Sequence, residues 1–243
     1  MNFSPQVFLD ALTSKALREG LIVTIELTLA SFAIGVVIGL VIALLRQSRF
    51  RVVRSAAWTY VWIFRAIPTL VLLLMIWNAL PQLITAFKGT WWSPFIAATV
   101  GLALNEAAYA AEIIRAGLLS IDEGQHLAAR ALGMQPRTVF RRIVAPQLIR
   151  VAIPTLANDF ITLLKITSLA YVVGLREILT NAQTQVASDF RFAEWYAAAG
   201  VYYLVLVSIF MVFQAWLERR YVWTSTARAG RLTAGILRGM PAR

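Results

Sequence analysis

The sequence contains no cysteine and only one histidine. Without cysteine the chain has no disulfide, no thiolate nucleophile and no cysteine-based zinc site, and one histidine excludes most histidine metal sites. The phosphate-binding pattern GxxxxGK[ST] is also absent, so ATP is not expected to bind here through such a loop. We therefore predict no metal, no cofactor and no catalytic residue on this chain, and we predict that it is not an enzyme.

Charged residues are scarce as well. They make up 14% of the chain, hydrophobic residues make up 59%, and the mean hydropathy is +0.69, whereas soluble domains average about 25% charged and about 45–50% apolar residues. This composition excludes an ordinary soluble enzyme. The net charge of +11 could suggest a nucleic-acid partner, but the arginines gather between apolar stretches, so we expect no nucleic acid.

Long apolar stretches take up most of the chain. A helix needs roughly 20 mostly apolar residues to cross about 30 Å of hydrocarbon, and five stretches are of that kind. We predict an all-α integral membrane protein with five transmembrane helices in one domain over residues 21–220. The predicted spans cover residues 21–45, 57–80, 93–119, 147–175 and 195–217. Residues 1–20 would form an external N-terminal segment, and residues 221–243 a basic cytoplasmic tail.

The distribution of arginine predicts the orientation. Cytoplasmic loops of membrane proteins carry an excess of Lys and Arg. Arg46, Arg49, Arg51 and Arg54 follow the first span, and more arginines follow the third span and fill the tail. An external N-terminus and a cytoplasmic C-terminus place most of these residues inside.

Residues 121–146, between the third and fourth spans, are too polar to cross a membrane. Residues 125–132 favour a helix, Gly133 is well placed to end it with a left-handed residue, and Pro136 suits the first turn of a second short helix. Arg137 and Arg141 would lie on one face of that second helix. Such a pair could dock into a partner's groove, or it could be an ordinary amphipathic surface hairpin.

This loop resembles that of permease subunits of bacterial binding-protein-dependent ABC importers. Their loop pattern is Glu-Ala-Ala, three residues, Gly, nine residues, Ile, one residue, Leu-Pro. Here Leu127, Ala128 and Ala129 precede Gly133 at that spacing, and the pattern ends at Pro146. Leu127 replaces the usual glutamate, and Ala145 replaces the usual leucine.

Three flanking runs resemble the polar amino-acid branch of these importers. They are residues 105–115 (NEAAYAAEIIR), residues 124–134 (GQHLAARALGM) and residues 165–169 (KITSL), where Ile166 stands in place of the usual aspartate. The resemblance covers about residues 20–220. It implies a type I importer permease in the bacterial cytoplasmic (inner) membrane that moves a polar amino acid or a related small zwitterion.

The resemblance also implies partners. They are a second permease subunit (itself or a paralogue), two ATP-binding subunits that carry ATP and Mg²⁺, an extracytoplasmic substrate-binding protein and the lipid bilayer. The implied ATPase-coupling residues are Leu127, Ala128, Ala129, Gly133, Arg137 and Pro146. The alternative is a self-contained small secondary transporter or channel, although such transporters normally show internal repeats.

Polar residues recur at helical spacing inside two of the predicted spans. Asn105, Tyr109 and Glu112 share one face of the third, and Thr155, Asp159 and Thr162 share one face of the fourth, with Lys165 beside them. Embedded charges usually face protein or a water-filled cavity. These residues could line a substrate pathway, or they could form a network that holds the helices together.

Overall fold

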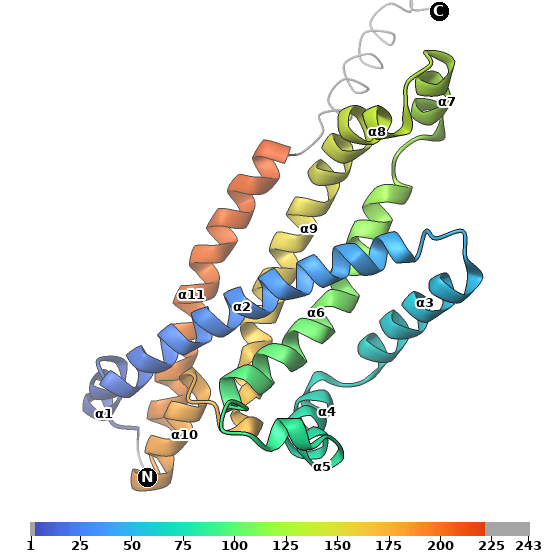
Figure 1. The fold of residues 1–243 in the computed structure, drawn as a ribbon. Helices are drawn as coiled ribbons and strands as arrows, with labels where there is room; N and C mark the ends of the chain where they lie inside the picture. The colour runs from blue at the N-terminus through green and yellow to red at the C-terminus, as the bar shows by residue number, and fades with distance from the viewer. Residues whose placement is uncertain (1–2, 222–243) are drawn as a thin grey trace, which may run out of the picture.

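The computed structural model describes residues 3–221 of the chain, and every regular element in that part is a helix (Figure 1). The predicted all-α class is therefore confirmed. The predicted basic tail, residues 221–243, lies outside the described residues except for Tyr221.

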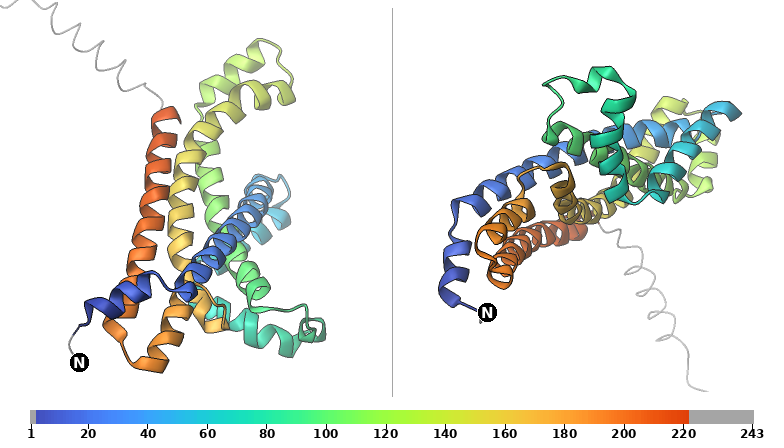
Figure 2. Two further views of the ribbon diagram at one scale, coloured as in Figure 1. Left: turned by 90° about the vertical axis from the view of Figure 1, so that its left-hand side faces the viewer. Right: turned by 90° about the horizontal axis from the view of Figure 1, so that it is seen from below.

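The helices alternate in direction between two ends of the molecule (Figures 1 and 2). The longer elements are α2 (Lys15–Leu45), α3 (Arg51–Ala66), α6 (Pro94–Leu119), α9 (Ala145–Ile166), α10 (Ile178–Asp189) and α11 (Phe192–Tyr221). The shorter elements are α1 (Pro5–Leu12), α4 (Thr69–Leu74), η1 (Met75–Ala79), α5 (Leu80–Leu83), η2 (Thr85–Lys88), α7 (Glu123–Ala131), α8 (Pro136–Val139), η3 (Phe140–Val144) and η4 (Thr167–Val173). The α7–α8 segment lies at one end, and α1 and α10 lie at the other.

Small residues allow α2 and α6 to pack closely. Ser31, Gly35, Gly39 and Ala43 recur every fourth residue on α2, and all four are buried. A Cβ atom on Gly39 would lie 2.7 Å from the Cβ of Ala110 on α6. Only residues without bulky side chains permit such an approach, as in small-residue contacts between membrane helices.

The second predicted span, residues 57–80, is not one straight helix. Helix α3 ends at Ala66, and the chain continues through α4, η1 and α5 to Leu83 at an angle of 102° to it. Pro68 causes the break, because proline has no N–H to donate and disfavours helical geometry in the preceding residue. We call α3 and the segment Thr69–Leu83 the bent helix pair. It is long and apolar enough to cross a membrane only if the two halves are counted as one span.

The fourth predicted span begins earlier than expected. Elements α8, η3, α9 and η4 form one helical run, Pro136–Val173. The second short helix expected in residues 121–146 is therefore the first part of this run and not a separate element. The run includes a wider π-type turn over Phe140–Val144, just before Pro146, and proline rings favour such local widening because they clash with the carbonyl four residues earlier.

By length and composition, α2, the Pro136–Val173 run and α11 can each cross a membrane, and the bent helix pair raises the total to four. Helix α6, the third predicted span, is not among them. It carries Glu106, Glu112 and Arg115, which lower its hydropathy. It nevertheless lies between α2, α3 and α9, and most of its length is buried. Neighbouring helices therefore cover side chains that lipid would not tolerate.

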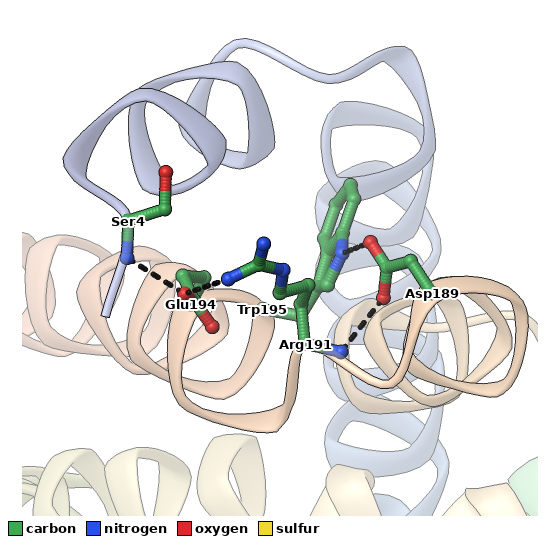
Figure 3. A network of polar contacts seen from close by, with 5 residues as sticks. All are labelled: Ser4, Asp189, Arg191, Glu194 and Trp195. Atoms are coloured by element: carbon green, nitrogen blue, oxygen red, sulfur yellow. Dashed lines mark hydrogen bonds and ion pairs between the residues drawn. The ribbon is translucent and has the colours of Figure 1, made fainter. Parts of the chain in front are cut away.

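A polar network fixes the N-terminal segment to the turn between α10 and α11 (Figure 3). The backbone N–H of Ser4 donates to Oε1 of Glu194 over 2.8 Å, and Nε1 of Trp195 donates to Oδ2 of Asp189 over 2.8 Å. The turn contains Phe190 in a left-handed conformation, with φ of 58°. The predicted external segment, residues 1–20, is mainly helical from Pro5 onward, and α2 already begins within it, at Lys15.

Candidate functional site

The hairpin of residues 121–146 projects beyond the ends of α6 and α9 (Figures 1 and 2). Its first helix, α7, begins where the Asp122 side chain accepts a hydrogen bond of 3.0 Å from the N–H of Gly124. The helix ends at Ala131, and Gly133, which has φ of 67°, follows the C-cap residue Leu132. There the N–H of Gly133 bonds to the carbonyl of Arg130, and the N–H of Met134 bonds to that of Ala129. This is the Schellman arrangement, and it confirms the left-handed cap expected at Gly133.

The predicted coupling residues divide into two groups. Ala129 is 1% exposed and packs inside the hairpin against Val139 and Val144. The others lie on the exposed side of the hairpin: Leu127, Ala128, Gly133, Arg137 and Pro146. Ala129 therefore holds the two arms of the hairpin together, while the exposed residues form the surface that a partner can reach.

Leu132 is a surface residue that the sequence pattern did not single out. It is 79% exposed, next to Gly133, and Leu127 is 57% exposed on the same helix. The tip of the projecting hairpin therefore exposes two large apolar side chains, which a docked partner would cover. The signal in the sequence was a leucine at the helix end, directly before the capping glycine.

Arginines flank this apolar tip. Arg137, Arg141 and Arg142 line a surface cleft of about 390 Å³ together with Thr138. The lining contains no carboxylate. The hairpin therefore offers a partner apolar side chains and positive charge, which suits an acidic rim around an apolar groove.

The polar residues of α9 lie on an exposed face. Thr155, Asn158, Thr162 and Lys165 follow one another at spacings of three or four residues, and all four are exposed. The hydroxyl groups of Thr155 and Thr162 each donate to a carbonyl of their own helix. We call these four residues the α9 stripe.

Asp159 is turned away from the α9 stripe. It is half-buried, and its carboxyl group interacts with that of Glu106 on α6. Glu106 itself is 3% exposed. Its Oε1 atom and the Oδ2 atom of Asp159 are both buried, and no group in the described part of the chain donates to them. Two carboxyl groups can bond to each other only when one of them carries a proton.

The three predicted residues of α6 have separate environments. Asn105 is buried and contacts the bent helix pair, with its Nδ2 atom 2.7 Å from the carbonyl oxygen of Phe64. Tyr109 is partly exposed, and the guanidinium of Arg65 lies 5.3 Å from its ring centroid. Glu112 forms ion pairs with Arg46 and Arg115. The structure therefore does not gather these residues into one site with the α9 stripe.

No group of three or more histidine, aspartate or glutamate side chains within residues 3–221 is placed to hold a metal ion. The geometry offers an exposed polar face on a helix long enough to cross a membrane, and a projecting hairpin with an apolar tip. Neither arrangement contains a nucleophile paired with a base.

The comparisons with known proteins agree on one family. The family described as "Binding-protein-dependent transport system inner membrane component" matches residues 35–223. The probable amino-acid permease protein YxeN of Bacillus subtilis is 37% identical over 203 residues, which is 84% of this chain and 90% of that protein. The octopine transport system permease protein OccM of Rhizobium radiobacter is 37% identical over 219 residues, covering 86% and 89% respectively.

Solved structures show the same fold. An amino acid ABC transporter crystallised with histidines has a chain that matches with a TM-score of 0.78 and 36% identity, covering 84% of this chain and 94% of that chain. A chain of the methionine transporter MetNI, in an inward-facing conformation, matches with a TM-score of 0.69 and 22% identity, covering 85% and 96%. At 22% identity, the match to the MetNI chain shows a shared fold and nothing further.

Proposed function

The chain belongs to the family of binding-protein-dependent transport system inner membrane components, and we propose that it is the permease subunit of an ABC importer for amino acids. Relatives at 36–37% identity are named as permeases for amino acids, for arginine and for octopine. The substrate is accordingly a polar amino acid or a related small zwitterion. A permease of this kind forms the path and leaves ATP hydrolysis to other subunits.

The observation that carries the proposal is the α9 stripe. Four polar side chains, one of them the charged Lys165, are exposed on a helix within a candidate membrane span. A lysine in hydrocarbon costs about 2.5–3.5 kcal/mol on insertion scales, so such side chains face protein or water. In the proposed assembly the stripe faces a second permease subunit, either itself or a paralogue, and lines the path between the two.

The proposed topology has five spans, an external N-terminus and a cytoplasmic C-terminus in the bacterial cytoplasmic membrane. Helix α6 is the remaining span, screened from lipid by its neighbours. Arginines at the α2–α3 turn, on the hairpin and at the end of α11 lie toward the hairpin end, which supports a cytoplasmic hairpin under the positive-inside rule. An externally active reporter enzyme fused between α5 and α6 should be active, and one fused within the hairpin should be silent.

The proposed partners at the hairpin are two ATP-binding subunits that hold ATP and Mg²⁺. The exposed residues of the hairpin contact the ATPase, namely Leu127, Ala128, Gly133, Arg137 and Pro146, and the buried Ala129 keeps the hairpin in shape. Because Leu127 stands where the family usually has glutamate, its contact is apolar and insensitive to salt. A substrate-binding protein delivers the amino acid at the opposite end, near α1 and α10.

Reconstitution tests the function. Proteoliposomes that contain this chain, its cognate ATPase and its binding protein should take up a radiolabelled amino acid only with ATP. Lys165→Met should lower uptake at least about tenfold while the complex still assembles, whereas Lys15→Met, which alters an exposed pair with Glu19, should leave uptake unchanged. ATP-independent uptake by this chain alone would instead identify a self-contained transporter.

A further inference from the structure

Three helices meet around a basic surface cleft near the hairpin end of the molecule. The cleft has a volume of about 350 Å³. Arg46 and Arg115 come from the ends of α2 and α6, and Arg54 comes from the first turns of α3. The remaining wall residues are Gln47, Ser55, Trp58 and Leu119. We call this feature the arginine cleft.

Positive charge in the arginine cleft exceeds negative charge. Glu112 is the carboxylate next to it, and it already accepts from two arginines: Oε1 pairs with Arg46, and Oε2 accepts from Arg115 over 2.7 Å. Arg54 pairs with no carboxylate among residues 3–221, and its Nη1 atom makes a single long contact of 3.5 Å with the Ser48 carbonyl. Glu112 therefore pairs with two of the three guanidinium groups, and the charge of Arg54 is not balanced by a carboxylate in this part of the chain.

The pKa of Arg46 responds to its burial and to the neighbouring positive charges. Burial lowers the pKa of the Arg46 guanidinium, and the positive charges of Arg115 and Arg65 lower it further. A second anion in the cleft would relieve this repulsion, because opposite charges favour the ionised form of an arginine. The hydroxyl of Ser55 adds a neutral hydrogen-bond donor beside the guanidinium groups.

The walls indicate where such an anion would come from. Trp58 is half-exposed and stacks on Trp62 one turn later, with ring centroids 6.1 Å apart. Exposed tryptophans are typical of the boundary between hydrocarbon and headgroups. Leu119 and the end of α2, at Leu44 and Leu45, add exposed apolar surface next to the cleft. The cleft therefore joins a basic interior to an apolar rim.

We propose that the arginine cleft binds the phosphate headgroup of an anionic phospholipid of the cytoplasmic leaflet. Arg54 and Arg115 contact the phosphate oxygens, since guanidinium groups bind phosphate with paired N–H donors. Trp58 and Leu119 contact the first part of the acyl chains. This site rests on the proposed membrane orientation, but it is independent of substrate and of the ATPase, so it can be tested without transport.

Native mass spectrometry of the full chain in detergent counts bound lipids directly. Phosphatidylglycerol and phosphatidylcholine with identical acyl chains are titrated separately, and inorganic phosphate is added in excess as a competitor. We expect phosphatidylglycerol to bind more tightly than phosphatidylcholine. Arg54→Gln should weaken phosphatidylglycerol binding at least about fivefold, the effect of about 1 kcal/mol per basic residue near a membrane, while Arg54→Lys should retain most of it.

Arg51→Gln is the matched control, because Arg51 lies on the same helix turn but does not line the cleft. It should bind phosphatidylglycerol as the wild type does. Equal losses in Arg51→Gln and Arg54→Gln would mean general surface attraction and would overturn the site. Equal affinity for the two lipids, or full displacement of phosphatidylglycerol by inorganic phosphate, would also overturn it. Unchanged thermal unfolding of each variant shows that binding, and not folding, has been altered.

Discussion

Asn105 of α6 donates a hydrogen bond of 2.7 Å to the carbonyl oxygen of Phe64 near the end of α3. In an unbroken helix that carbonyl would accept from the residue four positions later, which is Pro68 and has no N–H. Asn105 therefore supplies the donor that the proline removes. Its own Oδ1 atom lies 3.4 Å from the hydroxyl of Thr69, on the other side of the break. One side chain thus connects both halves of the bent helix pair to α6.

This relationship predicts a stability loss in Asn105→Ala. The Phe64 carbonyl, which lies in a partly buried contact, would lose this donor. A fully buried unsatisfied group costs about 1–3 kcal/mol, so we expect a loss toward the lower end of that range. Thermal unfolding of the purified full chain in detergent, followed by tryptophan fluorescence, measures the loss.

Pro68→Ala tests whether the proline is the cause. Ile67 is extended in the structure, but alanine at position 68 permits α3 to continue through Ile67, and its N–H can then bond to the Phe64 carbonyl. In that background, Asn105→Ala should cost clearly less than in the wild type, as a double-mutant cycle would show. Equal costs in both backgrounds would mean that Asn105 stabilises the fold by some other contact.

Close packing of α2 on α6 gives a second prediction. An added Cβ at Gly39 would lie 2.7 Å from Ala110 Cβ and 2.9 Å from the carbonyl oxygen of Ala107, so the helices would have to separate. Overpacking of this kind costs about 1–3 kcal/mol. Gly39→Ala should therefore lower the unfolding temperature. Gly200→Ala on α11 is the control, because a Cβ there meets no atom within 4 Å, and it should not destabilise the chain.

The turn at Gly133 gives a third prediction, which separates backbone strain from crowding. A Cβ at Gly133 would have no neighbour within 4 Å, but φ is 67°. Gly133→Val should therefore distort the hairpin through its backbone alone, whereas Gly133→Asn should be tolerated because asparagine adopts left-handed conformations more readily. We expect Gly133→Val to insert normally and to lose co-purification of the ATPase. Similar loss in Gly133→Asn would point to a direct contact of the glycine surface instead.

The sequence was sufficient to predict the helical class, the positions of most apolar stretches and the capping role of Gly133, because these depend on composition and local geometry. It did not predict the continuous run from Pro136, since short-range signals cannot reveal whether a π-type turn carries a helix past Pro146. Nor could the sequence show that the side chain of Asp159 points away from its polar neighbours on α9. Helical periodicity placed Thr155, Asp159 and Thr162 on one face, but only the packing of α6 shows that Asp159 turns toward Glu106.

The Glu106–Asp159 pair gives the last prediction and distinguishes the two roles that the sequence left open for Asp159. The amide of Asp159→Asn can donate to Glu106, so this variant should keep the stability of the wild type within about 1 kcal/mol. Asp159→Leu provides no donor and leaves the buried Glu106 carboxyl unpaired, which should cost about 1–3 kcal/mol. Unfolding and ATP-dependent uptake should both be measured for each variant.

If Asp159→Asn keeps both stability and uptake, the pair holds α6 and α9 together, and its charge is not needed for transport. If Asp159→Asn is stable but uptake falls, the carboxylate acts on the substrate path. A fully stable Asp159→Leu would show that the two carboxyl groups do not depend on each other.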